Sequence, residues 1–226
     1  MKTKSQNAAK SRTRQRAEIS GSFKRISSLA SYMPNKIIFN KGEPAEYLYK
    51  VESGCIRTYS EFDGGLRRIH AFYFAGDYFG MEPGEAHSLS AQAVTASSLR
   101  LIKMRALMAR AARDIEMVKF LLAITTSELQ RTQSHNLLLL KGARERIIDF
   151  LLDLQRRKQN GSEIDLPMPR RDIADYLGLT IETVSRALTR LRNTSAISLL
   201  SSRRVILRDP PAPGPYQIQE PDRPSV

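Results

Sequence analysis

Residues 169–192 read PRRDIADYLGLTIETVSRALTRLR, and this stretch decides the fold of the chain. Two helical patterns flank Gly178, a residue that suits the left-handed conformation at the end of a helix. Pro169 suits the first turn of the earlier helix, because a proline there sacrifices no hydrogen bond. Thr180 is a good N-cap for the later helix. The stretch therefore predicts two helices joined by a glycine turn, with the spacing typical of DNA-binding helix-turn-helix motifs.

The second of these helices has a polar stripe. Glu182, Ser185, Arg186 and Thr189 fall at i, i+3, i+4 and i+7, so they share one face near the helix start. Arginine can donate two hydrogen bonds to guanine, glutamate can accept one from cytosine, and serine can bond either base. The stripe predicts contact with base edges, and the alternative is a solvated ion pair between Glu182 and Arg186. The residues expected to pack inward are Ile173, Ala174, Leu177, Val184, Ala187, Leu188 and Leu191.

The flanking segments extend the motif to a domain. Residues 197–200 and 205–207 are apolar and strand-like, and they flank the basic turn at 201–204. This pattern predicts a β-hairpin, or wing, after the second helix. Residues 143–158 carry a broad apolar face and predict a further helix. We therefore expect a winged helix-turn-helix domain over residues 142–208.

A long helix is expected over residues 106–140, because no proline or glycine interrupts this stretch. Part of it repeats at alternating steps of four and three residues, which is the seam of a coiled coil. Polar residues in such a seam fix register and strand number, so we interpret the helix as a dimer interface. The alternative is a helix packed on its own domain. The seam consists of Val118, Leu122, Thr125, Leu129, Thr132, Asn136 and Leu139.

The preceding stretch, from about 34 to 105, has the pattern of β-strands. Tyr47, Tyr49 and Val51 alternate with the residues between them, as in a pleated sheet. Glycines punctuate the stretch, and residues 63–65 read DGG, a turn signal between two strands. Short, regularly spaced strands predict a sandwich or barrel. Because no helical pattern interrupts them, a parallel α/β sheet is not expected.

The composition limits the partners. Lysine and arginine total 36 against 23 acidic residues, so a net charge of +13 favours a polyanion such as DNA, RNA or an acidic membrane. Cys55 is the single cysteine, expected to be a buried apolar residue, with a redox thiol as the alternative. No membrane span or signal peptide is recognised, which favours the cytoplasm. The basic segment 1–20 and the proline-rich segment 209–226 are expected to be disordered tails.

The sequence resembles the Crp/Fnr regulator superfamily over about residues 25–208. The matching motifs are GEPA at 42–45, FAGDYFG at 74–80, the long helix and ETVSR at 182–186. The resemblance implies an α+β fold with an N-terminal β-roll, that is, a double-stranded β-helix like that of cyclic-nucleotide-binding domains. A dimerisation helix and a C-terminal winged helix-turn-helix follow. The corresponding boundaries are 21–105, 106–141 and 142–208.

The same resemblance assigns site residues. It implies that Glu182, Ser185 and Arg186 read bases, while Arg170, Thr180 and Thr183 lie near the DNA backbone. It also implies that the loops at 60–67 and 157–166 contact RNA polymerase.

Departures from the family pattern indicate the branch. Met81 and Leu89 stand where the nucleotide-binding members carry a glutamate and an arginine, so a cyclic phosphate would lack its counter-charge. The N-terminal cysteine cluster of the oxygen-sensing members is absent from the sequence. The remaining match is to the FixK-like branch. It implies a homodimer on a TTGAT-N4-ATCAA type of palindrome, acting as an activator in microaerobic or nitrogen metabolism, with no cofactor or metal.

Two alternatives remain open at the level of sequence. One is a Crp/Fnr sensor of a small ligand or of haem, in which His70, His87 or Met81 would ligate iron. The other is a cupin-like enzyme, because cupins share the β-roll. Cupin metal sites need several histidines on neighbouring strands, and His135 falls on the predicted long helix. We therefore expect no catalytic residues and no enzymatic activity.

Overall fold

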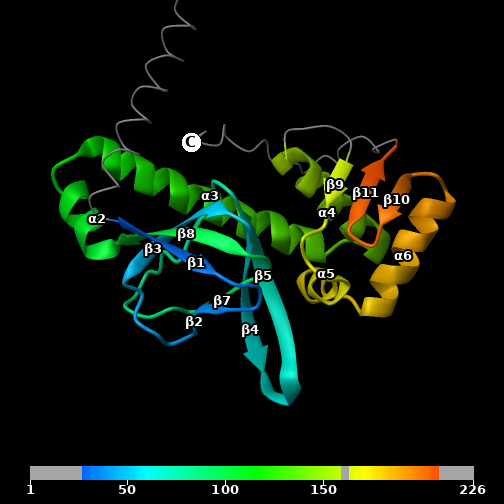
Figure 1. Ribbon diagram of the computed structural model, residues 1–226, viewed down its shortest axis with the longest axis horizontal. Helices are drawn as coiled ribbons and strands as arrows, with labels where there is room; N and C mark the ends of the chain where they lie inside the picture. The colour runs from blue at the N-terminus through cyan, green and yellow to red at the C-terminus, as the bar shows by residue number, and fades with distance from the viewer. Residues whose placement is uncertain (1–26, 159–162, 209–226) are drawn as a thin grey trace, which may run out of the picture.

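The computed structural model describes residues 27–158 and 163–208; the two predicted tails and residues 21–26 lie outside these ranges. Two four-stranded antiparallel sheets form the N-terminal half (Figure 1). The first sheet has the order β1 (Ser27–Tyr32), β8 (Ser97–Lys103), β3 (Tyr47–Ser53), β6 (Tyr78–Phe79). The second has the order β2 (Ile37–Phe39), β7 (Ser90–Ala93), β4 (Cys55–Phe62), β5 (Leu66–Phe74). The predicted β-roll is confirmed, and β1 begins before the stretch in which strands were expected.

The alternation seen in the sequence separates two cores. On β3, Tyr49 and Val51 pack between the two sheets, against residues such as Phe79. Leu48 points to the opposite face, where it packs with Leu107 and Met117 of the adjoining helices. Because successive side chains of a strand point to opposite faces, one strand can serve both cores.

The strands β4 and β5 are likewise buried on both faces. Ile56 and Tyr73 pack into the core between the sheets. Cys55, Tyr59 and Phe72 pack outward into a cluster that also contains most of the core of the C-terminal half. Burial raises the pKa of the Cys55 thiol and so disfavours the reactive thiolate. One continuous core therefore joins two regions that the sequence analysis treats as separate domains.

The prediction of a single helix over residues 106–140 is wrong. The structure has α2 (Met104–Ala111) and α3 (Ile115–Leu139). Asp114 lies between them with an extended backbone, and its side chain accepts a hydrogen bond of 3.0 Å from the backbone N–H of Glu116. An aspartate N-cap satisfies an otherwise free donor, so it starts a new helix even without proline or glycine. The coiled-coil repeat lies entirely on α3.

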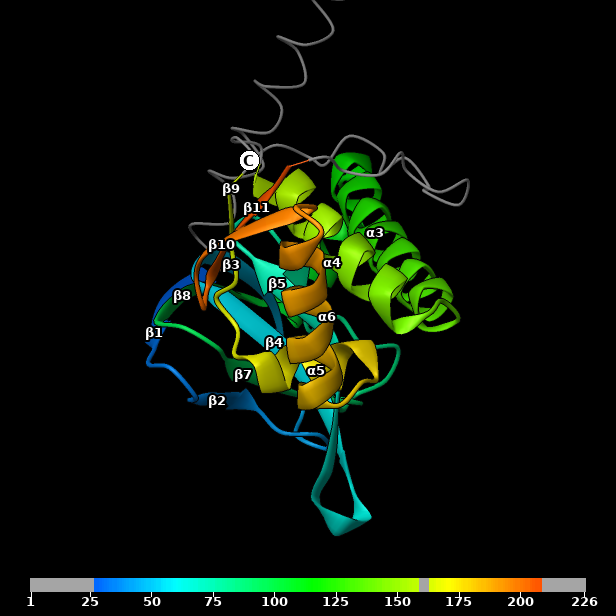
Figure 2. The ribbon, with the colours of Figure 1, turned by 90° about the vertical axis from the view of Figure 1, so that its right-hand side faces the viewer.

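The C-terminal half contains α4 (Ala143–Lys158), α5 (Arg170–Leu177) and α6 (Ile181–Asn193), together with a small sheet. The sheet has the order β10 (Ile197–Ser201), β11 (Arg204–Leu207), β9 (Glu163–Asp165). The predicted wing is the β10–β11 hairpin, in which Ile197 pairs with Leu207. Strand β9 extends this hairpin to three strands, a pairing that the sequence analysis does not anticipate. Figure 2 shows α5 and α6 side by side, and α5 also contacts β5.

Candidate nucleic-acid interface

The helix-turn-helix forms through local signals at its turn. Gly178 adopts the left-handed conformation, with φ 63° and ψ 42°, and ends α5. Thr180 caps α6, because its hydroxyl accepts a hydrogen bond of 3.1 Å from the backbone N–H of Thr183. Pro169 is the residue that precedes α5. Val184, Leu188 and Leu191 of α6 are buried against the core.

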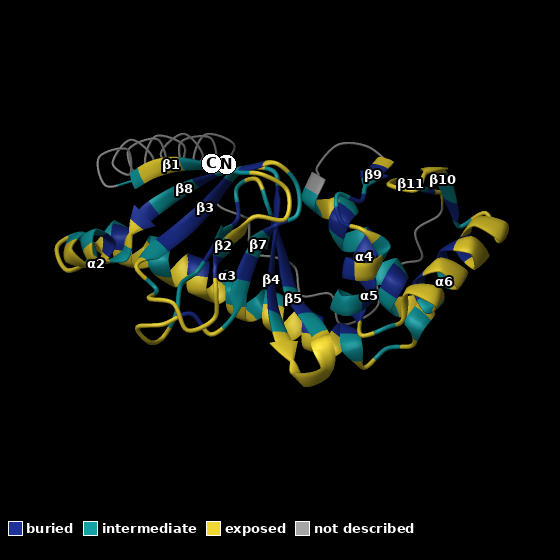
Figure 3. Cartoon of the chain, turned by 60° about the horizontal axis from the view of Figure 1, so that its bottom comes forward, coloured by how far each residue is buried: buried dark blue, intermediate teal, exposed yellow. Residues whose placement is uncertain are grey.

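The opposite face of α6 is open to solvent. Glu182, Ser185 and Arg186 are all exposed, and Figure 3 shows exposed residues along the length of this helix. Hydrogen bonds from its own backbone N–H and from the hydroxyl of Thr180 hold the pKa of Glu182 below its usual range. The Glu182 carboxylate is therefore a hydrogen-bond acceptor at neutral pH. The stripe combines an acceptor, a hydroxyl and a guanidinium, which is the chemistry that reads base edges.

The three residues expected near the DNA backbone lie around this face. Thr180 is exposed at the start of α6, and Thr183 is half-buried one turn further on. Arg170 is half-buried at the start of α5, where its Nη2 donates a hydrogen bond of 3.0 Å to the carbonyl of Ser202 in the wing turn. Arg170 thus connects α5 to the wing. Its contact with phosphate stays a prediction.

The seam of α3 forms a second exposed stripe. Leu122 is 64% exposed and Leu129 is 56% exposed, although both are leucines. Val118 is exposed too, whereas Met117 and Ile124 on the opposite face of α3 are buried. The helix therefore packs one face on its own β-roll, and within the described residues it leaves most of the other face exposed. The exposed seam residues are Val118, Leu122, Thr125, Leu129, Thr132 and Asn136, and Leu139 is half-buried.

Each of the three candidate iron ligands, and also His135, contacts a different group. His70 bonds the hydroxyl of Ser60 at 2.9 Å, and Nε2 of His135 donates to the carbonyl of Tyr176 at 2.8 Å. His87 stacks on Phe39 with ring centroids 3.5 Å apart. The sulfur of Met81 accepts a hydrogen bond from Thr125 on α3. Within the described ranges, no group of three His, Cys, Asp or Glu side chains is arranged to hold a metal ion.

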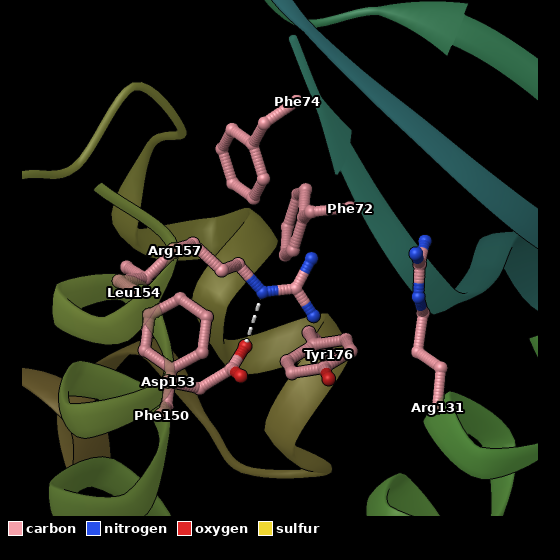
Figure 4. A pocket seen from close by; sticks show the side chains of 8 residues that line it. All are labelled: Phe72, Phe74, Arg131, Phe150, Asp153, Leu154, Arg157 and Tyr176. Atoms are coloured by element: carbon pink, nitrogen blue, oxygen red, sulfur yellow. Dashed lines mark hydrogen bonds and ion pairs between the residues drawn. The ribbon is translucent and has the colours of Figure 1, made fainter. Parts of the chain in front are cut away.

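One proposed polymerase contact needs correction. The side chain of Arg157 is only 10% exposed, and its Nε donates a hydrogen bond of 2.7 Å to Asp153. It lies beside Phe72 and Tyr176 in a small pocket where α4, α5 and β5 meet (Figure 4). The prediction that Arg157 belongs to a surface loop is therefore wrong. Of the two predicted loops, 60–67 contains the exposed tip of the β4–β5 hairpin, whereas residues 159–162 lie outside the described ranges.

The sequence analysis misses a charged cluster at the same junction. Asp172 of α5 is paired with Arg57 of β4 and Arg67 of β5, and Arg67 also binds Asp175 at 2.7 Å. The spacing of these residues could have revealed the cluster. Asp172 and Asp175 are three residues apart, so they share one side of α5, and Arg57 is a charged residue near the apolar start of a strand.

None of the helices in the part of the chain that the structure describes has the length and apolarity needed to cross a membrane.

Comparisons with known proteins agree with this architecture. Residues 29–114 match the cyclic nucleotide-binding domain family, and residues 145–212 match the Crp-like helix-turn-helix domain family. The chain is 48% identical over 186 residues to the nitrogen fixation regulation protein FixK of Azorhizobium caulinodans, covering 80% of this chain and 75% of that protein. It is 38% identical to the FixK protein of Rhizobium meliloti, covering 81% of this chain and 84% of that one.

A solved structure gives the same result. The structure of FixK2 from Bradyrhizobium japonicum superposes with a TM-score of 0.79 at 42% identity, covering 81% of this chain and 93% of that chain. The fold and the similar proteins thus indicate the same family. The chain belongs to the Crp/Fnr superfamily of transcription regulators, in its FixK-like branch.

Proposed function

We propose that the protein is a homodimeric regulator that reads a palindrome of the TTGAT-N4-ATCAA type through α6. The observation that carries the proposal is the exposed stripe of Glu182, Ser185 and Arg186 on a helix whose opposite face is buried. In this arrangement, Arg186 donates two hydrogen bonds to the guanine of each half-site. Glu182 accepts one from a cytosine, and Ser185 bonds a neighbouring base.

The DNA backbone is held from around α6. Thr180 and Thr183 lie at its N-terminus, where the helix dipole favours phosphate. Arg170 supports the wing and supplies a positive charge beside the groove. These contacts fix the position of the protein on the duplex without selecting the sequence.

The exposed seam of α3 is the proposed dimer interface. Two copies of the stripe Val118, Leu122 and Leu129 would remove large aliphatic side chains from water, which is favourable in proportion to the area buried. Thr125, Thr132 and Asn136 interrupt the apolar seam and would fix its register. A two-fold axis through this interface would place the two α6 helices about 34 Å apart, in successive major grooves.

Regulation in this proposal needs neither a cyclic nucleotide nor a metal cofactor. Met81 and Leu89 supply no charge to hold a cyclic phosphate, and Met81 bonds Thr125 of α3. The names of the relatives favour target genes for nitrogen fixation. In this proposal the protein acts on them as an activator. The tip of the β4–β5 hairpin would then contact RNA polymerase, because it projects away from both helical regions and is exposed (Figure 2).

The direct test is competition binding with the purified full chain. A labelled duplex carrying the palindrome is challenged with unlabelled duplexes in which each half-site position is varied in turn. We expect 10³-fold or greater preference for the palindrome over scrambled DNA, on the order found for specific regulators. We also expect the strongest dependence at the half-site guanine. Equal competition by scrambled DNA would refute the proposal.

A further inference from the structure

The junction between the β-roll and α5 contains a buried, charge-balanced cluster. The side chain of Asp172 is 2% exposed and that of Arg57 is 7% exposed, so this pair is shielded from water. Arg67 donates from Nη2 to Asp172, and from Nε and Nη2 to Asp175 at 2.9 and 2.7 Å. Arg57 also donates to the amide oxygen of Gln92 on β7. Two guanidinium groups thus hold two carboxylates across the junction.

Such a cluster restricts the relative orientation of the parts that it joins more than it adds to the stability of the fold. Removing charges from water costs several kcal/mol per ion, and buried ion pairs regain this only when their geometry is good. An apolar junction of the same shape would serve stability at least as well, and the neighbouring contact between Phe72 and Tyr176 is of that kind. A directional ionic network, by contrast, allows few relative orientations of the groups that it joins.

The cluster acts on the helix that carries α6. Asp172 and Asp175 hold one side of α5 to the β4–β5 sheet. The other end of α5 is held by its carbonyl groups, because Arg146 of α4 donates to Leu177 at 2.8 Å and His135 of α3 donates to Tyr176 at 2.8 Å. Helix α5 is therefore tied to the β-roll, to α3 and to α4. Helix α6 follows it through a short, capped turn and packs against it.

We propose that Arg57 and Arg67 are positioning residues for operator recognition. They act through Asp172 and Asp175 to fix the direction of α6 relative to α3. In a dimer formed through α3, that direction sets the separation of the two recognition helices, and hence the number of base pairs preferred between half-sites. This inference rests on the proposed palindrome binding, and it assigns the spacing preference to residues that do not touch DNA.

The test compares operators that differ only in spacing. Affinity is measured for the native spacer and for spacers one base pair shorter and longer, using the wild type, Arg67→Ala, Asp175→Ala and the double variant. We expect Arg67→Ala to lower the preference for the native spacer about fivefold, and the double variant to lower it no further, because the two residues act as one pair. Loss of folding stability alone would weaken binding to all three spacers alike.

A matched ion pair elsewhere serves as the control. Arg100 Nε lies 2.6 Å from Glu52 in the other sheet of the β-roll, partly buried and away from α5. We expect Arg100→Ala to leave the spacing preference unchanged. An unchanged preference in Arg67→Ala, or an equal change in Arg100→Ala, would overturn the proposal.

Hydrogen exchange of the DNA-free protein separates this inference from the proposed function. We expect Arg67→Ala to accelerate exchange at the amides of both β5 and α5, while α6 keeps its protection. If the wild type does not prefer the palindrome, the proposed function fails, and the exchange data alone decide whether the cluster restrains α5. Unchanged exchange at both elements would then refute the restraint.

Discussion

Helices α3 and α6 each bury one face and leave the other open, but their open faces differ in chemistry. On α3 the exposed stripe is largely aliphatic, with Leu122 and Leu129 more than half exposed. On α6 the exposed stripe contains Glu182, Ser185 and Arg186. An aliphatic stripe gains free energy when water leaves it, whereas a polar stripe must be given hydrogen-bond partners. The same helical periodicity therefore predicts a protein partner for α3 and a nucleic acid for α6.

The two stripes are also expected to control different properties of DNA binding, α3 the affinity and α6 the sequence specificity. The α3 stripe is mainly aliphatic and is proposed to bind a second copy of the chain, so dimerisation would join two DNA contacts into one bivalent contact. The α6 stripe offers the groups that select bases. Changes on α3 should thus affect every palindrome, and changes on α6 should affect particular positions.

The largest effect is expected from breaking the α3 stripe. Replacing Leu122 and Leu129 together with glutamate would bury unpaired charge in the interface, so the protein should sediment as a monomer. Operator affinity should fall on the order of 10²-fold, because the second half-site no longer binds in the same complex. Ala123→Glu, at an exposed position of α3 outside the seam, is the control. A double variant that remains dimeric contradicts the assignment of the interface.

Removing the guanidinium from the α6 stripe should have the next largest effect. We expect Arg186→Ala to lose roughly 1–3 kcal/mol per half-site and to relax the preference for guanine at one position. Arg192→Ala removes an exposed charge from the last turn of the same helix, beyond the residues proposed to read bases, and should leave base preference intact. Competition binding measures both. If Arg186→Ala binds more weakly but still prefers guanine, Arg186 contacts phosphate instead.

A smaller and sequence-independent effect is expected at the edge of the α6 stripe. Arg170→Ala should weaken binding to all sequences alike and reduce the slope of log affinity against log salt by about one per half-site, as for a lost phosphate contact. Titrations at several salt concentrations measure the slope. A loss of affinity with an unchanged slope would show that Arg170 serves only to hold the carbonyl of Ser202 in the wing.

Substitutions at the tip of the β4–β5 hairpin should leave operator affinity unchanged. We expect Glu61→Ala and Asp63→Ala, at the exposed tip of the β4–β5 hairpin, to lower transcription in a reconstituted assay with RNA polymerase. The variants would still occupy the operator because their α3 and α6 stripes are intact. A parallel fall in occupancy and transcription would remove the hairpin tip as the polymerase contact.

Cyclic AMP should neither bind the protein nor change its affinity for the operator. Calorimetry at millimolar nucleotide should show no saturable heat, and operator affinity should be unchanged, because neither Met81 nor Leu89 can pair with a cyclic phosphate. A related regulator that responds to cyclic AMP is the positive control. Saturable binding in the micromolar range would contradict this prediction.

Local sequence signals determined much of the architecture. Gly178 and Thr180 set the helix-turn-helix, because the left-handed cap and the N-cap act within a few residues. The period of two in β3 indicated that its side chains alternate between two faces. The period of three and four in α3 indicated the stripe that the structure leaves exposed. Sequence alone did not locate the break before α3, because the cap of Asp114 outweighed an otherwise uninterrupted helical pattern.

Tertiary structure decided what depends on contacts between distant residues. Arg57 and Asp172 are 115 positions apart, so no local pattern pairs them. The burial of Arg157 likewise follows from packing against Phe72 and Tyr176, whereas the family resemblance placed it in a loop expected to contact RNA polymerase. The sequence by itself determined most of the elements and the chemistry of the exposed stripes, since these follow from periodicity and side-chain type. Only the folded chain decided how α5 is tied to the β-roll, because that orientation is a balance of buried contacts from four separate elements.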